Sequence, residues 1–161
     1  MSGGVEYDAI LPAPFGALGV RLADEALAGL DFLPPETALR PCGSAAVHRV
    51  AHELDAYYAD PRHVWKLILA PVGTLFRQRV WQVLAAIPSG QTRTYGDIAR
   101  ELASSPRAVG QAVGDNPIPI VIPCHRVLSA HGPGGFMHDT GGFPMTVKRW
   151  LLHHEGVELR D

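Results

Sequence analysis

The segment from Asn116 to Val127, with the sequence NPIPIVIPCHRV, constrains the fold of this chain more than any other. Its three prolines fix the backbone dihedral φ and remove amide donors, so the segment can form neither a helix nor a paired central strand. We expect a rigid extended arm that ends at Cys124 and His125. Such an arm would hold a thiol still beside a base.

Cys124 is the candidate nucleophile of a reactive-thiol site. The thiolate is the attacking species, and at the ordinary pKa of about 8.5 only roughly a few per cent of a cysteine is ionised near neutral pH. We therefore expect a neighbouring group to lower the pKa of Cys124, and His125 is the obvious candidate. Because adjacent side chains of an extended chain point to opposite faces, a bridging water is a more natural relay than direct contact.

Residues 91–116 have the pattern of a helix-turn-helix. Thr94-Tyr95-Gly96-Asp97 is typical of a capping box, and Ala103-Ser104 follows as a tight turn. Ser105 then caps a second helix with Pro106 at its first position. Without the cysteine motif, an ordinary helical hairpin would be the simpler interpretation. Small residues in the second helix would let its backbone approach a groove closely: Gly110, Ala112 and Gly114.

Length and hydrophobic pattern favour two small lobes. Short apolar runs typical of β-hairpins precede a helical pattern over 44–59, and a further helix is expected from Thr146 to Glu155. We expect a small α/β N-terminal domain over residues 1–70, with an antiparallel sheet plus a helix, and a mainly α-helical domain over 71–161. The predicted inward face of the last helix is Val147, Trp150, Leu151 and His154.

The net charge of −2 is unevenly divided along the chain. Residues 1–70 hold five Lys or Arg and nine Asp or Glu, a net −4, whereas residues 71–161 hold nine and seven, a net +2. Because Lys and Arg at phosphates supply most non-specific affinity for DNA, the second lobe predicts modest, salt-sensitive DNA binding.

Cysteine usage and hydropathy predict an intracellular protein, cytoplasmic or, in a eukaryote, nuclear. Cys42 and Cys124 are too few for a disulfide scaffold, and Cys42 is expected to be a bystander. No apolar stretch approaches the roughly 20 residues of a membrane-spanning helix, and no signal pattern opens the chain.

The Asn116–Val127 segment closely resembles the active-site signature of the O6-alkylguanine-DNA alkyltransferases, a family of suicide DNA-repair proteins. The resemblance spans roughly residues 73–156 and is much weaker before them. It implies that family's fold, a small α/β domain followed by a mainly helical active-site domain. Further matching segments are Arg107-Ala108-Val109-Gly110, Lys148-Arg149-Trp150-Leu151-Leu152 and His154-Glu155-Gly156.

The resemblance implies irreversible transfer of an alkyl group from O6 of a damaged guanine in duplex DNA to Cys124. The nucleotide must flip out, because a buried thiol cannot reach O6 inside a duplex. The implied activity is that of a methylated-DNA–[protein]-cysteine S-methyltransferase that acts once, as a monomer, without metal or organic cofactor. Preferred alkyl size and acceptance of O4-alkylthymine stay open.

The resemblance also implies roles around the thiol. His125 would take the thiol proton through a water, Glu155 would orient His125, and Asn116 would brace the turn between the second helix and the cysteine arm. Two alternatives stay open: Glu155 as a solvated surface residue, and Asn116 as a helix-terminating residue before Pro117.

At the DNA, the family pattern implies that Arg107 fills the stack left by the flipped nucleotide and that Tyr95 lies near its 3′ phosphate. A tyrosine packed on the core is the alternative for Tyr95. Further implied DNA contacts are Ala108, Gly110 and Gln111. The implied contacts of the flipped base are Tyr95, Val113, Val127, Phe136 and Thr140.

Residues 129–143 depart from the family pattern, because this loop is longer than usual and has Phe136 where a tyrosine is typical. In one alignment Thr140 supplies the backbone amide that meets O6, and Asp139 takes the aromatic position. A metal site of His131, His138 and Asp139 is disfavoured, since further ligands are missing.

Three other functions compete with DNA alkyl transfer. A non-catalytic sensor of alkylated bases would normally lack Cys124. A helix-turn-helix regulator would need more basic residues in its second helix. A cysteine hydrolase would need no DNA and would turn over many substrate molecules.

Overall fold

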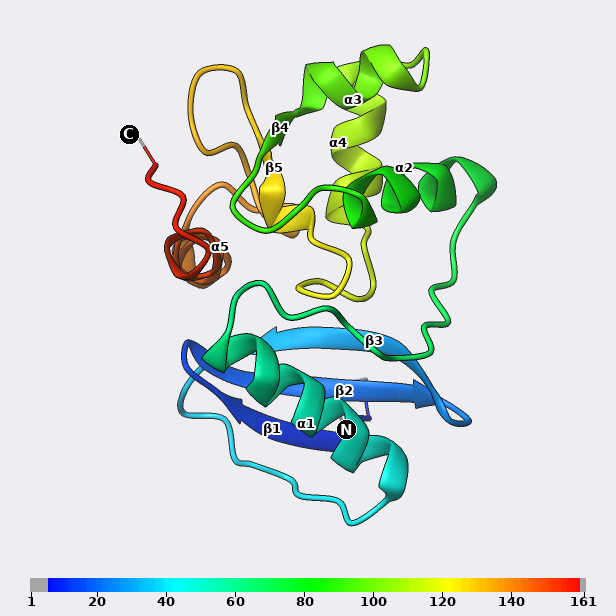
Figure 1. Ribbon diagram of the computed structural model, residues 1–161, viewed down its shortest axis with the longest axis vertical. Coiled ribbons are helices and arrows are strands. Elements are labelled where there is room, and N and C mark those ends of the chain that lie inside the picture. Colours follow the sequence, from blue (N-terminus) through cyan, green and yellow to red (C-terminus); the bar gives the residue numbers. More distant parts are fainter. Residues whose placement is uncertain (1–5, 160–161) are drawn as a thin grey trace, which may run out of the picture. The chain divides into compact units, whose positions relative to one another are not determined.

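The computed structural model describes residues 6–159, and the chain divides into two compact units, Met1–Pro71 and Val72–Asp161 (Figure 1). The first unit is a three-stranded antiparallel sheet in the order β1-β2-β3 with one helix lying across it. Its elements are β1 (Ala9–Ala13), β2 (Gly16–Ala23), β3 (Ala26–Leu33) and α1 (Ala45–Ala59). The second unit is mainly helical. The fold class expected from the sequence is therefore confirmed.

The core of the first unit lies between one face of its sheet and the apolar face of α1. Ser44 is the N-cap of α1: its Oγ accepts a hydrogen bond from the amide of Val47 at 3.2 Å. The helix then presents its apolar face to the sheet. The buried side chains include Leu18, Val20, Leu27 and Leu30 from the strands and Val47, Val50, Leu54 and Tyr57 from α1.

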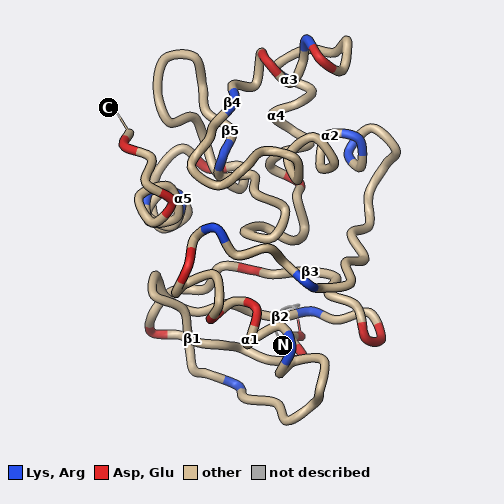
Figure 2. Tube along the Cα trace, viewed as in Figure 1, with Lys and Arg blue, Asp and Glu red and all other residues tan. Residues whose placement is uncertain are grey.

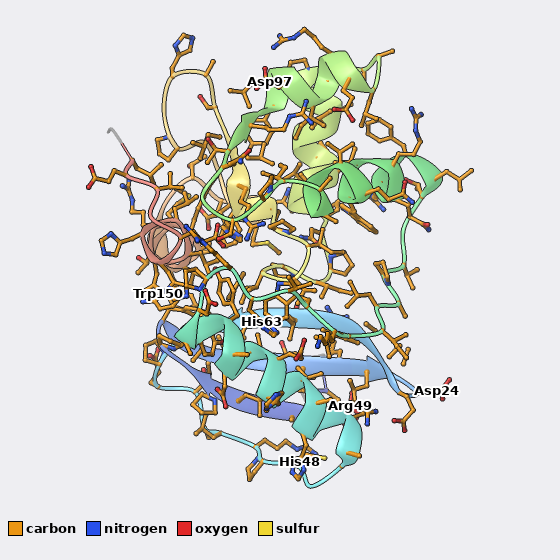
Figure 3. All side chains as sticks on the ribbon, viewed as in Figure 1. Asp24, His48, Arg49, His63, Asp97 and Trp150 are labelled. Atoms are coloured by element: carbon orange, nitrogen blue, oxygen red, sulfur yellow. The ribbon has the colours of Figure 1, made fainter. Side chains whose placement is uncertain are left out.

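The second unit contains the predicted helix-turn-helix. Its elements are α2 (Leu75–Ala85), β4 (Arg93–Thr94), α3 (Tyr95–Glu101), α4 (Pro106–Gly114), the 3-10 helix η1 (Cys124–Arg126), β5 (Val127–Leu128) and α5 (Gly142–His154). Thr94 and Asp97 form the predicted capping box of α3, with two hydrogen bonds of 3.0 Å; Figure 3 labels Asp97. Ser105 caps α4. The buried Trp81 of α2 donates its Nε1 hydrogen to Ala112 O at 2.9 Å, which ties α2 to α4.

The prediction that the segment before Cys124 forms an extended arm is wrong. Residues 117–122 fold into consecutive turns in which the amide of Ile122 donates to Ile118 O at 2.9 Å and Ile120 has a φ of +74°. Cys124 then begins η1. Proline fixes φ near −65° but leaves ψ free, so these prolines are as compatible with turns as with extended chain.

The predicted face of the last helix is only partly correct. Val147 and Leu151 are buried, but Trp150 (Figure 3) and His154 are half-buried and stack on each other with ring centroids 4.8 Å apart. Lys148 is fully buried instead. Hydrophobic periodicity predicts that a lysine is exposed, whereas the ammonium group of Lys148 is buried and donates hydrogen bonds to backbone carbonyls.

Candidate active site around Cys124

Cys124 lies in the first position of η1 with an exposed fraction of 1%. Burial raises the pKa of its thiol to about 11, although a hydrogen bond with Asn116 and the positive charge of Lys148 both lower it. The expectation of a lowered pKa is therefore wrong for this conformation. A thiol that is protonated at neutral pH must lose its proton as it reacts.

Asn116 ties the end of α4 to the turns before Cys124. Its Nδ2 donates to Ile122 O at 2.7 Å, and its Oδ1 accepts the amide of Ile118 at 3.0 Å. The side chain is buried and takes the place of backbone partners that the prolines cannot supply. This geometry fits the bracing role that the sequence suggested.

His125 and Arg126 converge on the carboxylate of Glu155, at the C-terminal end of α5. His125 Nε2 lies 2.8 Å from Glu155 Oε2. Arg126 binds the same carboxylate with both Nε and Nη2, each at 2.8 Å, and its Nη1 donates to Ile87 O. The Glu155 side chain is fully buried, so the surface alternative for this residue is wrong.

The protonation states in this cluster follow from burial and from the arginine. Burial raises the pKa of Glu155, but hydrogen bonds from His125 and Arg126 outweigh it and hold the pKa well below its usual range. Burial, together with the positive charges of Arg126 and Lys148, lowers the pKa of His125 more than Glu155 raises it. The imidazole is thus neutral at pH 7 and donates Nε2–H to the carboxylate.

The other ring nitrogen of His125 is consequently an acceptor. Nδ1 is buried and has no hydrogen-bond partner among residues 6–159. A neutral imidazole with a bare Nδ1 can receive a proton, while the ionised Glu155 stabilises the imidazolium that forms. The cluster therefore holds a group with the chemistry of a general base next to Cys124 in the chain.

Lys148 and Arg126 are the residues that sequence reasoning missed. Lys148 Nζ donates to Val127 O at 2.8 Å, to Pro133 O at 2.7 Å and to Gly135 O at 2.8 Å. Burial lowers the pKa of Lys148 to about 8. Both cations occur in segments that match the family pattern, but their buried partners are too distant in sequence to be inferred.

We expect Lys148→Met to reduce the free energy of unfolding by about 1–3 kcal/mol, because one buried and two partly buried carbonyls lose their shared donor. Loss of this charge should also raise the pKa of the Cys124 thiol. Urea denaturation measures the first effect, with Arg79→Met, an exposed change in α2 of the same unit, as control. Equal unfolding midpoints for the two variants would contradict a stabilising role of Lys148.

A cavity of about 230 Å³ opens beside α4 and the 129–143 loop. Of the residues that the sequence assigned to DNA or base, six line this cavity: Tyr95, Gly110, Gln111, Val113, Phe136 and Thr140. Three others lie elsewhere: Val127 is buried in β5, Ala108 is half-buried in α4, and Arg107 is exposed in the first turn of α4.

The 129–143 loop is organised by its own backbone. The amides and carbonyls of Phe136 and Asp139 pair in both directions, at 2.7 and 2.9 Å. The amide of Thr140 donates to Asp139 Oδ1 at 2.9 Å, so it is engaged within the loop. His138 pairs with Asp115 at 2.7 Å. Among the described residues no cluster of three or more His, Cys, Asp or Glu side chains could hold a metal ion.

Tyr95, the first residue of α3, adds a side-chain contact to the same loop. Its Oη donates to Gly135 O at 3.4 Å. Burial raises the pKa of Tyr95, so its hydroxyl is a donor at neutral pH.

Comparison with known proteins agrees with this architecture. Residues 75–157 match the family model described as the DNA binding domain of 6-O-methylguanine DNA methyltransferase. A methylated-DNA–protein-cysteine methyltransferase of Methanosarcina acetivorans is 36% identical over 158 residues, which cover 93% of this chain and 98% of that protein. The equivalent protein of Methanosarcina mazei is 46% identical over 114 residues, covering 69% of each chain.

A solved structure extends the likeness to three dimensions. The crystal structure of Mycobacterium tuberculosis OGT in complex with DNA has a TM-score of 0.74 and 35% identity, and the match covers 91% of this chain and 90% of that one. Both the sequence and the fold are thus shared over nearly the full length. The chain belongs to the methylated-DNA–protein-cysteine methyltransferase family.

Proposed function

We propose that this protein removes an alkyl group from O6 of guanine in double-stranded DNA and keeps it on Cys124. The observation that carries the proposal is the buried thiol preceding a neutral histidine whose Nε2 is held by an ionised glutamate at 2.8 Å. This arrangement supplies a nucleophile and its base. Family membership supports the choice of substrate.

In the proposed step, the sulfur of Cys124 attacks the alkyl carbon. A C–S bond forms, and the bond between that carbon and O6 breaks with its electron pair going to the guanine. The thiol proton passes through a bridging water to Nδ1 of His125, and one proton is returned to the guanine. Since the resulting thioether is stable to water, each molecule acts once. The proposed acting species is a monomer.

The DNA would bind along the helix-turn-helix. Apart from the buried Arg126 and Lys148, the described basic residues of the second unit lie in α2, β4, α3, α4 and α5 (Figure 2), which favours modest and salt-sensitive binding. Gly110 has no side chain, and the nearest atom to a Cβ built there lies 3.9 Å away, so the backbone of α4 can come close to DNA at this position. A relative crystallised with DNA supports this partner. Within residues 6–159, none of the helices has the length and apolarity to cross a membrane.

Arg107 is proposed to occupy the stack after the nucleotide flips out. It is exposed in the first turn of α4, where a side chain can enter a groove. Unstacking a base costs about a few kcal/mol, which an inserted side chain offsets.

We expect Arg107→Ala to slow repair of duplex DNA by roughly 10- to 100-fold and to leave repair of the same base in a single strand nearly unchanged. Single-turnover rates on the two substrates measure this difference. Arg100→Ala, which removes an exposed arginine from α3, is the matched control. An Arg107→Ala protein that repairs duplex DNA at the wild-type rate would exclude the stacking role.

The proposed function is tested by its stoichiometry. Protein is incubated with an excess of duplex oligonucleotide that carries one O6-methylguanine, and the bases repaired per protein molecule are counted. A plateau at one base per molecule is expected. Continued turnover would indicate a hydrolase instead, and DNA binding without loss of methyl would indicate a damage sensor.

A further inference from the structure

Met137 separates the cavity from the thiol. Its side chain contributes to the cavity lining, and its Sδ lies 3.9 Å from Cys124 Sγ. Among the described residues that line the cavity, Cys124 is absent, and only 1% of its surface is exposed. A group entering this cavity therefore meets the Met137 thioether before it meets the sulfur of Cys124.

The backbone holds Met137 in this position through a tight turn. Met137 and the next residue, His138, have φ values of +51° and +65°, between the paired residues Phe136 and Asp139. Two consecutive residues in the left-handed region are unusual without glycine, so other contacts must maintain the turn.

His138 supplies those contacts. Its Nε2 lies 2.7 Å from Asp115 Oδ1, and Asp115 is itself paired with Arg77 Nη2 at 2.7 Å. The imidazole also packs on Gly114, where a Cβ atom would come within 2.5 Å of the ring. The lack of a side chain at Gly114 thus lets the turn close against the end of α4.

We propose that Met137 is a gate in front of Cys124 that determines the size of the alkyl group which the thiol accepts. This inference rests on the proposed function. Reacting atoms must approach to about 3–3.5 Å, and the thioether of Met137 occupies space beside the sulfur where the alkyl group arrives. A methyl group displaces little of this flexible side chain, whereas a benzyl group requires all of it to leave.

Access to the thiol can be tested without DNA. Wild-type protein, Met137→Ala and Met137→Leu are treated with iodoacetamide, and the rates at Cys124 and Cys42 are compared by peptide mapping. Cys42 is an internal reference in the other unit. Met137→Ala is expected to raise the ratio of the Cys124 rate to the Cys42 rate about tenfold, whereas Met137→Leu, of similar size, keeps it near the wild-type value. An unchanged ratio in Met137→Ala would overturn the inference.

Size selection is tested with two duplexes that carry O6-methylguanine or O6-benzylguanine at the same position. Met137→Ala is expected to raise the benzyl-to-methyl rate ratio at least about tenfold, and His131→Ala, an exposed change in the same loop, is expected to leave it unchanged. If Met137→Ala transfers methyl and its benzyl-to-methyl rate ratio equals that of the wild-type protein, the gate role of Met137 is overturned but the proposed function is not. No transfer by the wild-type protein from either base would instead overturn the proposed function, and size selection with it.

Discussion

Replacing Cys124 with alanine is expected to abolish alkyl transfer completely and to leave the affinity for duplex DNA within about twofold of wild type. The thiol is the proposed acceptor of the alkyl group, so no rate remains when it is removed. Its side chain is buried within the site and lies against Met137, so its removal changes little of the surface that DNA would contact. Transfer from O6-methylguanine and equilibrium DNA binding, measured on the same preparation at fixed salt, separate the two effects.

Cys42→Ala is the matched control for Cys124→Ala, because it removes the other cysteine of the chain. We expect it to transfer one alkyl group per molecule, as the wild-type protein does. Residual transfer by Cys124→Ala would refute Cys124 as the acceptor. Loss of DNA binding in that variant would show that the cysteine has a structural role in the interface.

The second large effect is expected for Glu155→Gln. Glutamine has no negative charge with which to stabilise the imidazolium of His125. Nδ1 of His125 therefore becomes a weaker base. General base catalysis contributes about 10²- to 10⁴-fold to such rates, and we expect a loss of this size in the single-turnover transfer rate. Quench-flow or manual sampling at saturating DNA measures it.

Glu155→Gln should also destabilise the protein. The guanidinium of Arg126, which is largely buried, would lose its bidentate partner, and an uncompensated buried charge costs about 3–5 kcal/mol. Glu158→Gln, an exposed change nearby in the chain, is the matched control. Glu155→Gln with wild-type stability would show that the Arg126 contact contributes little to folding.

The same contact gives stability a defined pH dependence. The pKa of Glu155 is lower in the folded protein than in the unfolded chain, so the unfolded state binds the extra proton first. The stabilisation is fully present above the ordinary glutamate pKa of about 4.3 and is lost progressively as the pH falls below it. Unfolding measured between neutral and acidic pH should therefore show a smaller loss in Glu155→Gln than in wild type.

The helix-turn-helix could be predicted because its signals are local. Thr94 and Asp97 lie three residues apart and cap one helix, while Ser105 and Pro106 start the next. Each signal acts within one turn, so tertiary packing did not alter it.

The path to Cys124 could not be predicted in the same way. The prolines restrict φ, but the choice between extended chain and turns was made by the buried amide of Asn116, which bonds to Ile118 and Ile122. The family resemblance implied a bracing role for Asn116, but the proline pattern led to the wrong backbone path. A restriction on one dihedral does not determine a path.

Contacts between distant segments were the least predictable. Arg126 and Glu155 are 29 residues apart, and Lys148 is buried although charged residues are usually exposed. The position of Met137 depends on His138, Asp115 and the missing side chain at Gly114. No spacing or motif in the sequence predicts these contacts.

Intact-mass spectrometry followed by peptide mapping tests the central claim most directly. The protein is incubated with excess duplex DNA that carries a single O6-methylguanine. We predict that each molecule gains one methyl group, that the gain stops there, and that the methyl group maps to Cys124. A methyl group on another residue, or removal of methyl from DNA while the protein mass stays unchanged, would contradict the account.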